Sequence, residues 1–151
     1  MGHTRRTSER FCRRCLTCRR PPCGYDWTKA RSPARAKEIY DAQEVGGRGV
    51  VFVDARNWTE FSAGHIRGAM WIDKKHFDGA TPRKIREFLP GNAVVVYCHG
   101  ELCTDSEAVV RRLHALNLGI GPFFILRDGF DAWKRAGYPV DSGSEVGFDV
   151  R

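Results

Sequence analysis

The sequence lacks any long apolar run. Its longest candidates, residues 93–97 and 122–126, are only as long as a strand, and neither approaches the ~20 residues that a membrane-spanning helix needs. The N-terminus also lacks the apolar centre of a secretory signal. We therefore expect a protein without a membrane span.

Most of the chain also lacks an excess of positive charge, although its formal net charge is +7. Residues 1–37 hold eleven Lys and Arg against two acidic residues, so they carry +9. Residues 38–151 hold fourteen Lys and Arg against sixteen Asp and Glu, so their net charge is −2. The larger segment therefore gives no electrostatic reason to expect a nucleic-acid or membrane-surface partner.

Residues 1–24 lack helical or strand periodicity and contain almost no aliphatic side chains. This composition predicts a disordered basic tail. Four cysteines in it, Cys12, Cys15, Cys18 and Cys23, have a spacing typical of metal ligands, and four thiolates can bind zinc or an iron–sulfur cluster. The alternative is a tail that binds no metal. The composition favours that alternative, so we expect no cofactor.

The length of 151 residues suits one domain with a core of its own. Although the six cysteines form an even number, a chain of this size does not need disulfides for stability. We therefore expect the cysteines to be in a reducing compartment and the protein to be cytoplasmic.

Strands and helices are predicted to alternate along the chain. Continuous apolar runs at 50–53, 93–97 and 123–126 are typical of strands buried on both faces, and 27–30 is a candidate edge strand. Helices are expected from Ser32-Pro33 to before Gly46, at 58–63, at 82–89, after an N-cap at Asp105 or Ser106, and from Asp128-Gly129 to Gly137. This order predicts an α/β fold with a mostly parallel sheet and helices on both faces.

Cys98 directly follows the predicted strand 93–97, at the edge where such sheets bind ligands. We expect Gly100 to take a positive φ and help the loop turn into the next helix. Backbone N–H groups and the helix N-terminus should then favour a thiolate and cradle a persulfide or an oxyanion. The alternative is that Cys98 is a small buried apolar residue closing the strand.

Four motifs resemble those of the rhodanese family, in the same order and over roughly residues 26–141. They are Val53-Asp54-Ala55-Arg56, Gly64-His65-Ile66-Arg67-Gly68-Ala69, Val96-Tyr97-Cys98, and Asp128-Gly129-Phe130-Asp131-Ala132-Trp133 with Gly137-Tyr138-Pro139-Val140. The resemblance implies a rhodanese-like fold. It also implies transfer of sulfane sulfur from thiosulfate, a persulfide or a polysulfide, through a persulfide on Cys98, to a thiol acceptor. We divide the chain into a tail (1–24), a rhodanese-like domain (25–141) and a C-terminal tail (142–151).

The loop after Cys98 departs from the usual family pattern. Ser106 stands eight positions after Cys98, where six is usual, and Asp105 occupies a position often held by Arg. The loop resembles a bacterial subset that reads Cys-x-Gly-x-x-Cys-x-Asp-Ser. In that subset Cys103 belongs to the loop, and it is a candidate resolving thiol. The other loop residues are His99, Gly100, Glu101, Leu102, Thr104, Asp105 and Ser106.

The loop charges predict weak transfer from thiosulfate. Glu101 and Asp105 are negative where a dianion would sit, and the loop contains no Arg to anchor one. His99 could compensate as a cation or a proton donor, or it could simply be an exposed loop residue.

Four further residues are candidates to support the pocket: Asp54, Arg56, His65 and Arg67. A structural role is the favoured interpretation. In this interpretation, Asp54 accepts N–H hydrogen bonds at the sheet edge, and His65 fixes a turn through its ring nitrogens. Arg67 is a candidate to face the Cys98 pocket and supply the missing positive charge.

Four functions remain open from the sequence. The first is a sulfurtransferase or sulfane-sulfur carrier, and the second is a redox protein using Cys98 and Cys103 as a dithiol. The third is a non-catalytic binding domain. A phosphatase or arsenate reductase is the weakest, because its transition state needs the Arg that this loop lacks. The oligomeric state is left open.

Overall fold

A computed structural model describes residues 30–145 of the chain. The predicted disordered tail, the four cysteines between Cys12 and Cys23, and all but the last residue of the expected strand at 27–30 lie outside the described residues. Contacts continue past the expected domain boundary at 141, because the Gly143 N–H donates to Ser62 O (2.8 Å) and Lys84 Nζ lies 2.7 Å from Glu145 Oε1. The division of the chain into segments stays a prediction.

The described elements alternate between strands and short helices. In chain order they are α1 (Pro33–Ala42), β1 (Glu44–Val45), β2 (Arg48–Asp54), α2 (Trp58–Ala63), β3 (His65–Ile66), β4 (Met70–Trp71), the 3-10 helix η1 (Lys74–Phe77), α3 (Arg83–Phe88), β5 (Ala93–Tyr97), α4 (Asp105–Ala115), β6 (Phe123–Leu126), α5 (Gly129–Arg135) and β7 (Val140–Asp141). No helix within residues 30–145 is long and apolar enough to cross a membrane.

The central sheet is mostly parallel, as predicted. Its strands run in the order β1-β2-β5-β6, and β4 pairs with the end of β2. β2, β4, β5 and β6 pair in parallel, whereas the short β1 is antiparallel to β2. β3 and β7 form a separate antiparallel pair. This α/β arrangement brings the carboxyl ends of β2, β5 and β6 to one edge.

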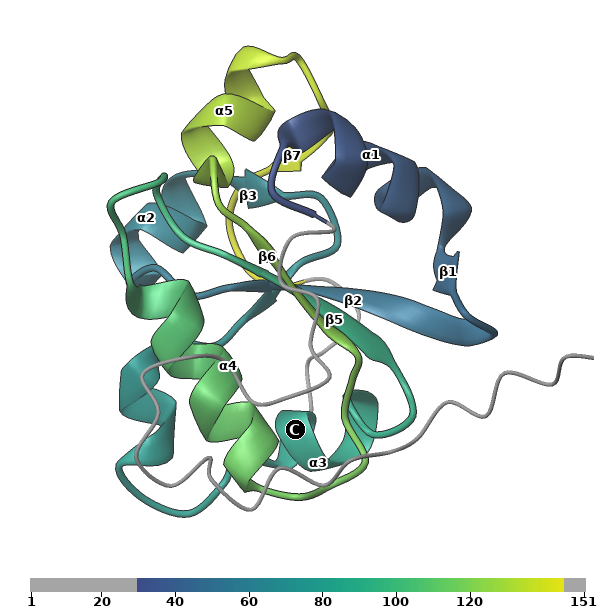
Figure 1. Ribbon diagram of the computed structural model, residues 1–151. Coiled ribbons are helices and arrows are strands. Elements are labelled where there is room, and N and C mark those ends of the chain that lie inside the picture. Colours follow the sequence, from purple (N-terminus) through teal and green to yellow (C-terminus); the bar gives the residue numbers. More distant parts are fainter. Residues whose placement is uncertain (1–29, 146–151) are drawn as a thin grey trace, which may run out of the picture.

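Each face of the sheet is covered by its own apolar cluster, because side chains of a strand alternate between the two faces. One cluster joins Val94, Val96 and Cys98 to residues of α3 and α4. The other joins Val95 and Tyr97 to residues of α1, α2 and α5. Figure 1 shows α3 and α4 on one side of the central strands and α1 and α5 on the other. Cys98 therefore belongs to the α3–α4 side.

Local signals set most helix boundaries. The Ser32 hydroxyl accepts the Arg35 N–H (3.3 Å) at the start of α1, with Pro33 at the first helical position, as predicted. The prediction for α4 is wrong by one or two residues. Thr104 is its N-cap residue and makes no side-chain cap bond, so Asp105 and Ser106 both lie inside the first turn. The reason is that the loop delivers Ser106 to the Cys98 sulfur instead of to the helix end.

Candidate active site around Cys98

Cys98 lies at the carboxyl end of β5, the strand between β2 and β6. The preceding residue, Tyr97, is in register with Asp54 of β2 and Leu126 of β6. All five residues of β5 are buried, and the Cys98 side chain is only 2% exposed. The sequence predicted this position, and a fully buried central strand holds the sulfur rigidly.

The loop after Cys98 curls back over the sulfur. The Cys103 N–H donates to Gly100 O at 3.0 Å, which closes a tight turn. This turn places the Cys103 carbonyl oxygen 3.4 Å from Cys98 Sγ, and the buried Ser106 hydroxyl lies 3.7 Å from the same sulfur. The Cys98 thiol can donate its proton to either oxygen, so the resting loop accommodates a protonated sulfur.

The expectation of a resting thiolate is wrong. The pKa of the Cys98 thiol is raised to about 11, mainly by burial, and the neighbouring Cys103 side chain acts in the same direction. Hydrogen bonds from the backbone and hydroxyl of Ser106 lower this pKa, but by less than burial raises it. The stabilisation of a thiolate by the helix N-terminus is smaller than expected. Desolvation of a buried sulfur destabilises the anion by more than a single favourable contact stabilises it.

The N-terminal end of α5 fastens the loop from outside. The Phe130 N–H donates to Cys98 O at 2.8 Å, and the Asp131 N–H donates to His99 O at 3.3 Å. Gly129, at φ +69°, allows this approach, since a Cβ there would lie 2.1 Å from His99 O. Gly100 is not among the positive-φ glycines, so the positive φ predicted for Gly100 is wrong.

Two cations that the sequence analysis missed lie beside the first turn of α4. Lys74 of η1 is 3.3 Å from the Asp105 carboxylate, and Arg127, directly after β6, pairs with Glu107. These pairs offset part of the negative charge at the loop. Arg127 could have been found, because it follows a parallel strand next to β5. Lys74 gave no signal, since only tertiary packing brings η1 to α4.

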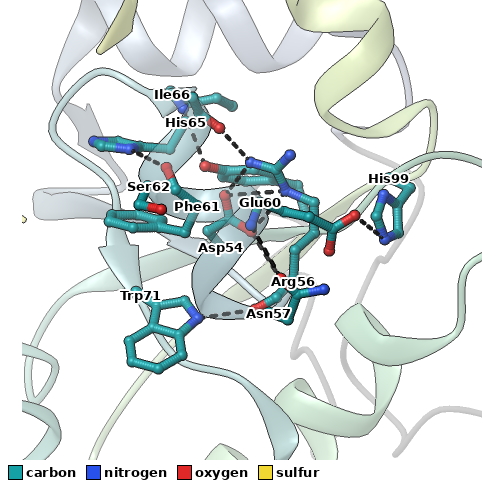
Figure 2. Close-up of polar contacts among 12 residues, drawn as sticks. Asp54, Arg56, Asn57, Glu60, Phe61, Ser62, His65, Ile66, Trp71 and His99 are labelled. Atoms are coloured by element: carbon teal, nitrogen blue, oxygen red, sulfur yellow. Dashed lines mark hydrogen bonds and ion pairs between the residues drawn. The ribbon is translucent and has the colours of Figure 1, made fainter. Parts of the chain in front are cut away.

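His99 contacts a side chain of α2. Its Nε2 lies 3.1 Å from Glu60 Oε1, and Figure 2 shows this contact. The second carboxylate oxygen, Glu60 Oε2, is buried without a hydrogen-bond partner. The sequence analysis did not single out Glu60. At the loop tip, Leu102 is 98% exposed, and Glu101 is exposed as well.

Asp54 and Arg56 form a buried ion pair that ties β2 to α2. Arg56 donates from Nη2 to Asp54 Oδ2 (2.6 Å) and to Gly64 O (2.6 Å), and its backbone N–H donates to Asp54 Oδ1 (2.9 Å), as Figure 2 shows. Burial lowers the pKa of Arg56, but the hydrogen bond and charge of Asp54 outweigh it and leave that pKa raised. The guanidinium also lies 4.1 Å from the Phe130 ring centroid. These contacts match the structural interpretation.

His65 and Arg67 are also occupied by contacts within the fold. His65 Nδ1 lies 2.8 Å from Phe61 O, and its ring stacks on Phe61. One ring nitrogen of His65 is thus engaged with a carbonyl of α2, in agreement with a structural role. Arg67 pairs with Asp141 at 2.9 Å and lines a cavity of about 160 Å³ with Tyr40 and Phe52, on the face opposite Cys98. The prediction that Arg67 faces the Cys98 pocket is therefore wrong, because β3 pairs with β7 on that other side.

Among residues 30–145, no group of three or more His, Cys, Asp or Glu side chains is placed to hold a metal ion. Both cysteines of this part of the chain, Cys98 and Cys103, are free thiols. The site thus consists of two nearby thiols, a buried hydroxyl and a rim of paired charges.

Comparisons with known proteins agree with this architecture. A model of the rhodanese-like domain family matches residues 32–136. An HTH-type transcriptional regulator from Mycobacterium tuberculosis is 33% identical over 110 residues, which cover 73% of this chain but only 45% of the regulator. The rhodanese-like domain of an Anabaena protein superposes with a TM-score of 0.57 at 23% identity, covering 82% of this chain and 86% of that one. A thiosulfate sulfurtransferase from Pseudomonas aeruginosa gives a TM-score of 0.53 at 22% identity, covering 80% of this chain and 21% of that one. At these identities the two structures show the fold alone.

Proposed function

Because this chain belongs to the rhodanese-like domain family, we propose that it is a sulfurtransferase or sulfane-sulfur carrier that works through a persulfide on Cys98. The observation that carries the proposal is the position of the Cys98 sulfur. It lies at the carboxyl end of a buried parallel strand, under a curled loop, with the Ser106 hydroxyl 3.7 Å away. The loop sequence supports membership of the Cys-x-Gly-x-x-Cys-x-Asp-Ser subset.

The proposed reaction has two sulfur transfers. In the first, the Cys98 thiolate attacks the outer sulfur of thiosulfate, a persulfide or a polysulfide, and the remainder of the donor leaves as sulfite, a thiolate or a shorter polysulfide. In the second, an acceptor thiolate attacks the outer sulfur of the Cys98 persulfide, and Cys98 leaves as a thiolate. Since the pKa of Cys98 is raised to about 11, loading begins with loss of the thiol proton, and its rate rises with pH.

The charges at the loop favour donors with little negative charge. Glu101 is exposed on the loop, and Asp105 holds Lys74 in an ion pair instead of leaving it for an anion. A guanidinium that could grip a dianion is absent from the loop sequence. We therefore propose organic persulfides and polysulfides, whose sulfur chain carries at most one negative charge, as better donors than the thiosulfate dianion, and a small or protein thiol as acceptor. A cytoplasmic setting belongs to the same proposal, because a reducing compartment keeps both thiols free.

A non-catalytic binding module is the second candidate. Two observations favour it. The raised pKa of Cys98 leaves little reactive thiolate at neutral pH, and the M. tuberculosis relative is a transcriptional regulator, of which this chain matches less than half. A module of that kind would need Cys98 only for packing, as a member of the α3–α4 side cluster.

Peptide mass mapping of the full chain separates the two candidates. Trypsin cleaves after Arg86 and Arg111, so one peptide, 87–111, carries Cys98 and Cys103 and none of the cysteines of the leading segment. After incubation with polysulfide, a sulfurtransferase gains the mass of one sulfur on this peptide. The gain is absent in Cys98→Ser and present in the matched control Cys103→Ser. Absence of the gain in both the wild type and Cys103→Ser favours the binding module.

A further inference from the structure

The loop brings a second sulfur to the sulfur of Cys98. The Gly100–Cys103 turn folds the chain back, so that Cys103 packs against the same apolar cluster that contains Cys98. The carbonyl oxygen of Cys103 lies 3.4 Å from Cys98 Sγ, and the neighbouring Cys103 side chain raises the pKa of the Cys98 thiol. Two free thiols, five residues apart in sequence, therefore belong to the same turn of the chain and pack against the same apolar cluster.

Accessibility differs between the two thiols. Cys98 is 2% exposed, whereas Cys103 is half-buried at the rim of the loop. A reagent reaching Cys98 passes the loop that carries Cys103. The hydrogen bonds from α5 reach only the first two residues of the loop. The N–H groups of Phe130 and Asp131 donate to the carbonyl oxygens of Cys98 and His99, and neither bond involves Cys103. The Cys103 end of the loop can therefore shift toward Sγ without breaking those bonds.

We propose that Cys103 is the resolving thiol of Cys98, which discharges the Cys98 persulfide by forming a Cys98–Cys103 disulfide. The Cys103 thiolate attacks Cys98 Sγ, a sulfur–sulfur bond forms between the two residues, and the bond from Cys98 Sγ to the outer sulfur breaks. The outer sulfur leaves with the electron pair and takes up protons as hydrogen sulfide. The two cysteines are oxidised to the disulfide while the sulfane sulfur is reduced to sulfide.

Two molecules of a small thiol, such as glutathione, then return the site to its resting state. They reduce the disulfide and are themselves joined as a disulfide, so the electrons balance. The inference rests on the proposed function, because it begins from the Cys98 persulfide. It adds that the site releases sulfide when no acceptor thiol intercepts the persulfide first.

The test follows the tryptic peptide 87–111 of the full-length protein after a pulse of inorganic polysulfide and removal of the excess. At each time point, free thiols are alkylated and sulfide in solution is measured. In the wild type, we expect the peptide carrying one extra sulfur to give way to a peptide that has lost two hydrogens and takes no alkyl group. Sulfide should appear at the same rate.

The Cys103→Ser variant nearly keeps the size of the side chain but removes the attacking sulfur. We expect its persulfide to last about tenfold longer or more, because the intramolecular thiol acts at a high effective concentration. An equal persulfide lifetime in wild type and Cys103→Ser, with no internal disulfide in the wild type, overturns the resolving role and leaves the sulfurtransferase proposal intact. Absence of any persulfide in both proteins overturns the two proposals together.

Discussion

The Asp54–Arg56 pair and the Cys98 loop lie at the carboxyl ends of neighbouring strands but differ in how their polar groups are bonded. Arg56 and Asp54 are buried, and each makes several hydrogen bonds within the fold. In the loop, the Cys98 sulfur has only weak sulfur hydrogen bonds, and Glu101 and Leu102 are exposed. The first region has little bonding capacity left for a ligand, whereas the second retains it.

This contrast separates residues that stabilise the fold from residues that can do chemistry. When one member of a buried hydrogen-bonded pair is removed, its partner is left without a hydrogen bond, and this loss destabilises the fold. A sulfur held in a rigid site with weak partners can exchange them for a substrate. Substitutions at Arg56 should therefore act on stability, and substitutions around Cys98 should act on reactivity.

The largest expected effect is that of Arg56→Ala. It leaves the buried Asp54 carboxylate unpaired, and breaking a buried pair in this way costs about 3–5 kcal/mol. Urea unfolding measures the loss. The control is Arg67→Ala, which removes the exposed pair with Asp141 and should barely change stability. Equal losses in the two variants would contradict the assignment of Arg56 as a buried structural cation.

Gly129→Ala should be the next most damaging change. The positive φ of +69° alone costs about 1–3 kcal/mol in a residue with a side chain, and the overlap with His99 O adds to it. Gly137→Ala is the matched control, because its φ is +75° and a Cβ there meets nothing within 4 Å. Thermal unfolding of the two variants isolates the contact with the loop. If they lose equal stability, α5 does not fasten the Cys98 loop.

The pKa of Cys98 should respond in opposite directions to its two neighbours. Ser106→Ala removes a hydroxyl that lowers this pKa and should raise it, whereas Cys103→Ala removes a side chain that raises it and should lower it. In the wild type, alkylation of Cys98 should be slow at neutral pH and accelerate toward pH 11. Alkylation rates across pH, read from peptide 87–111, provide the measurement. An apparent pKa near that of an unfolded cysteine, about 8.5, would contradict the buried thiol.

The smallest effect is expected from Leu102→Ser. Its side chain is 98% exposed at the loop tip, and exposed substitutions usually change stability by no more than about 0.5 kcal/mol. Neither the melting temperature nor persulfide formation on Cys98 should change. A clear loss of either would mean that the loop tip makes contacts that this structure does not contain.

Much of the fold could be predicted from the sequence, since its signals are local. Continuous apolar runs marked the strands that became Ala93–Tyr97 and Phe123–Leu126, and Ser32-Pro33 marked the start of α1. The parallel sheet followed from the alternation of elements. The placement of Cys98 at the strand end followed from its position directly after an apolar run.

What only the tertiary structure decided depends on contacts between distant segments. Gly129 lies against the Cys98 loop, Lys74 and Arg127 reach the first turn of α4, and Arg67 turns to the opposite face. The protonation of Cys98 belongs to the same class, because burial under the loop sets its pKa. A sequence determines which residues neighbour each other along the chain, but desolvation and charge pairing depend on packing, which joins residues far apart in sequence.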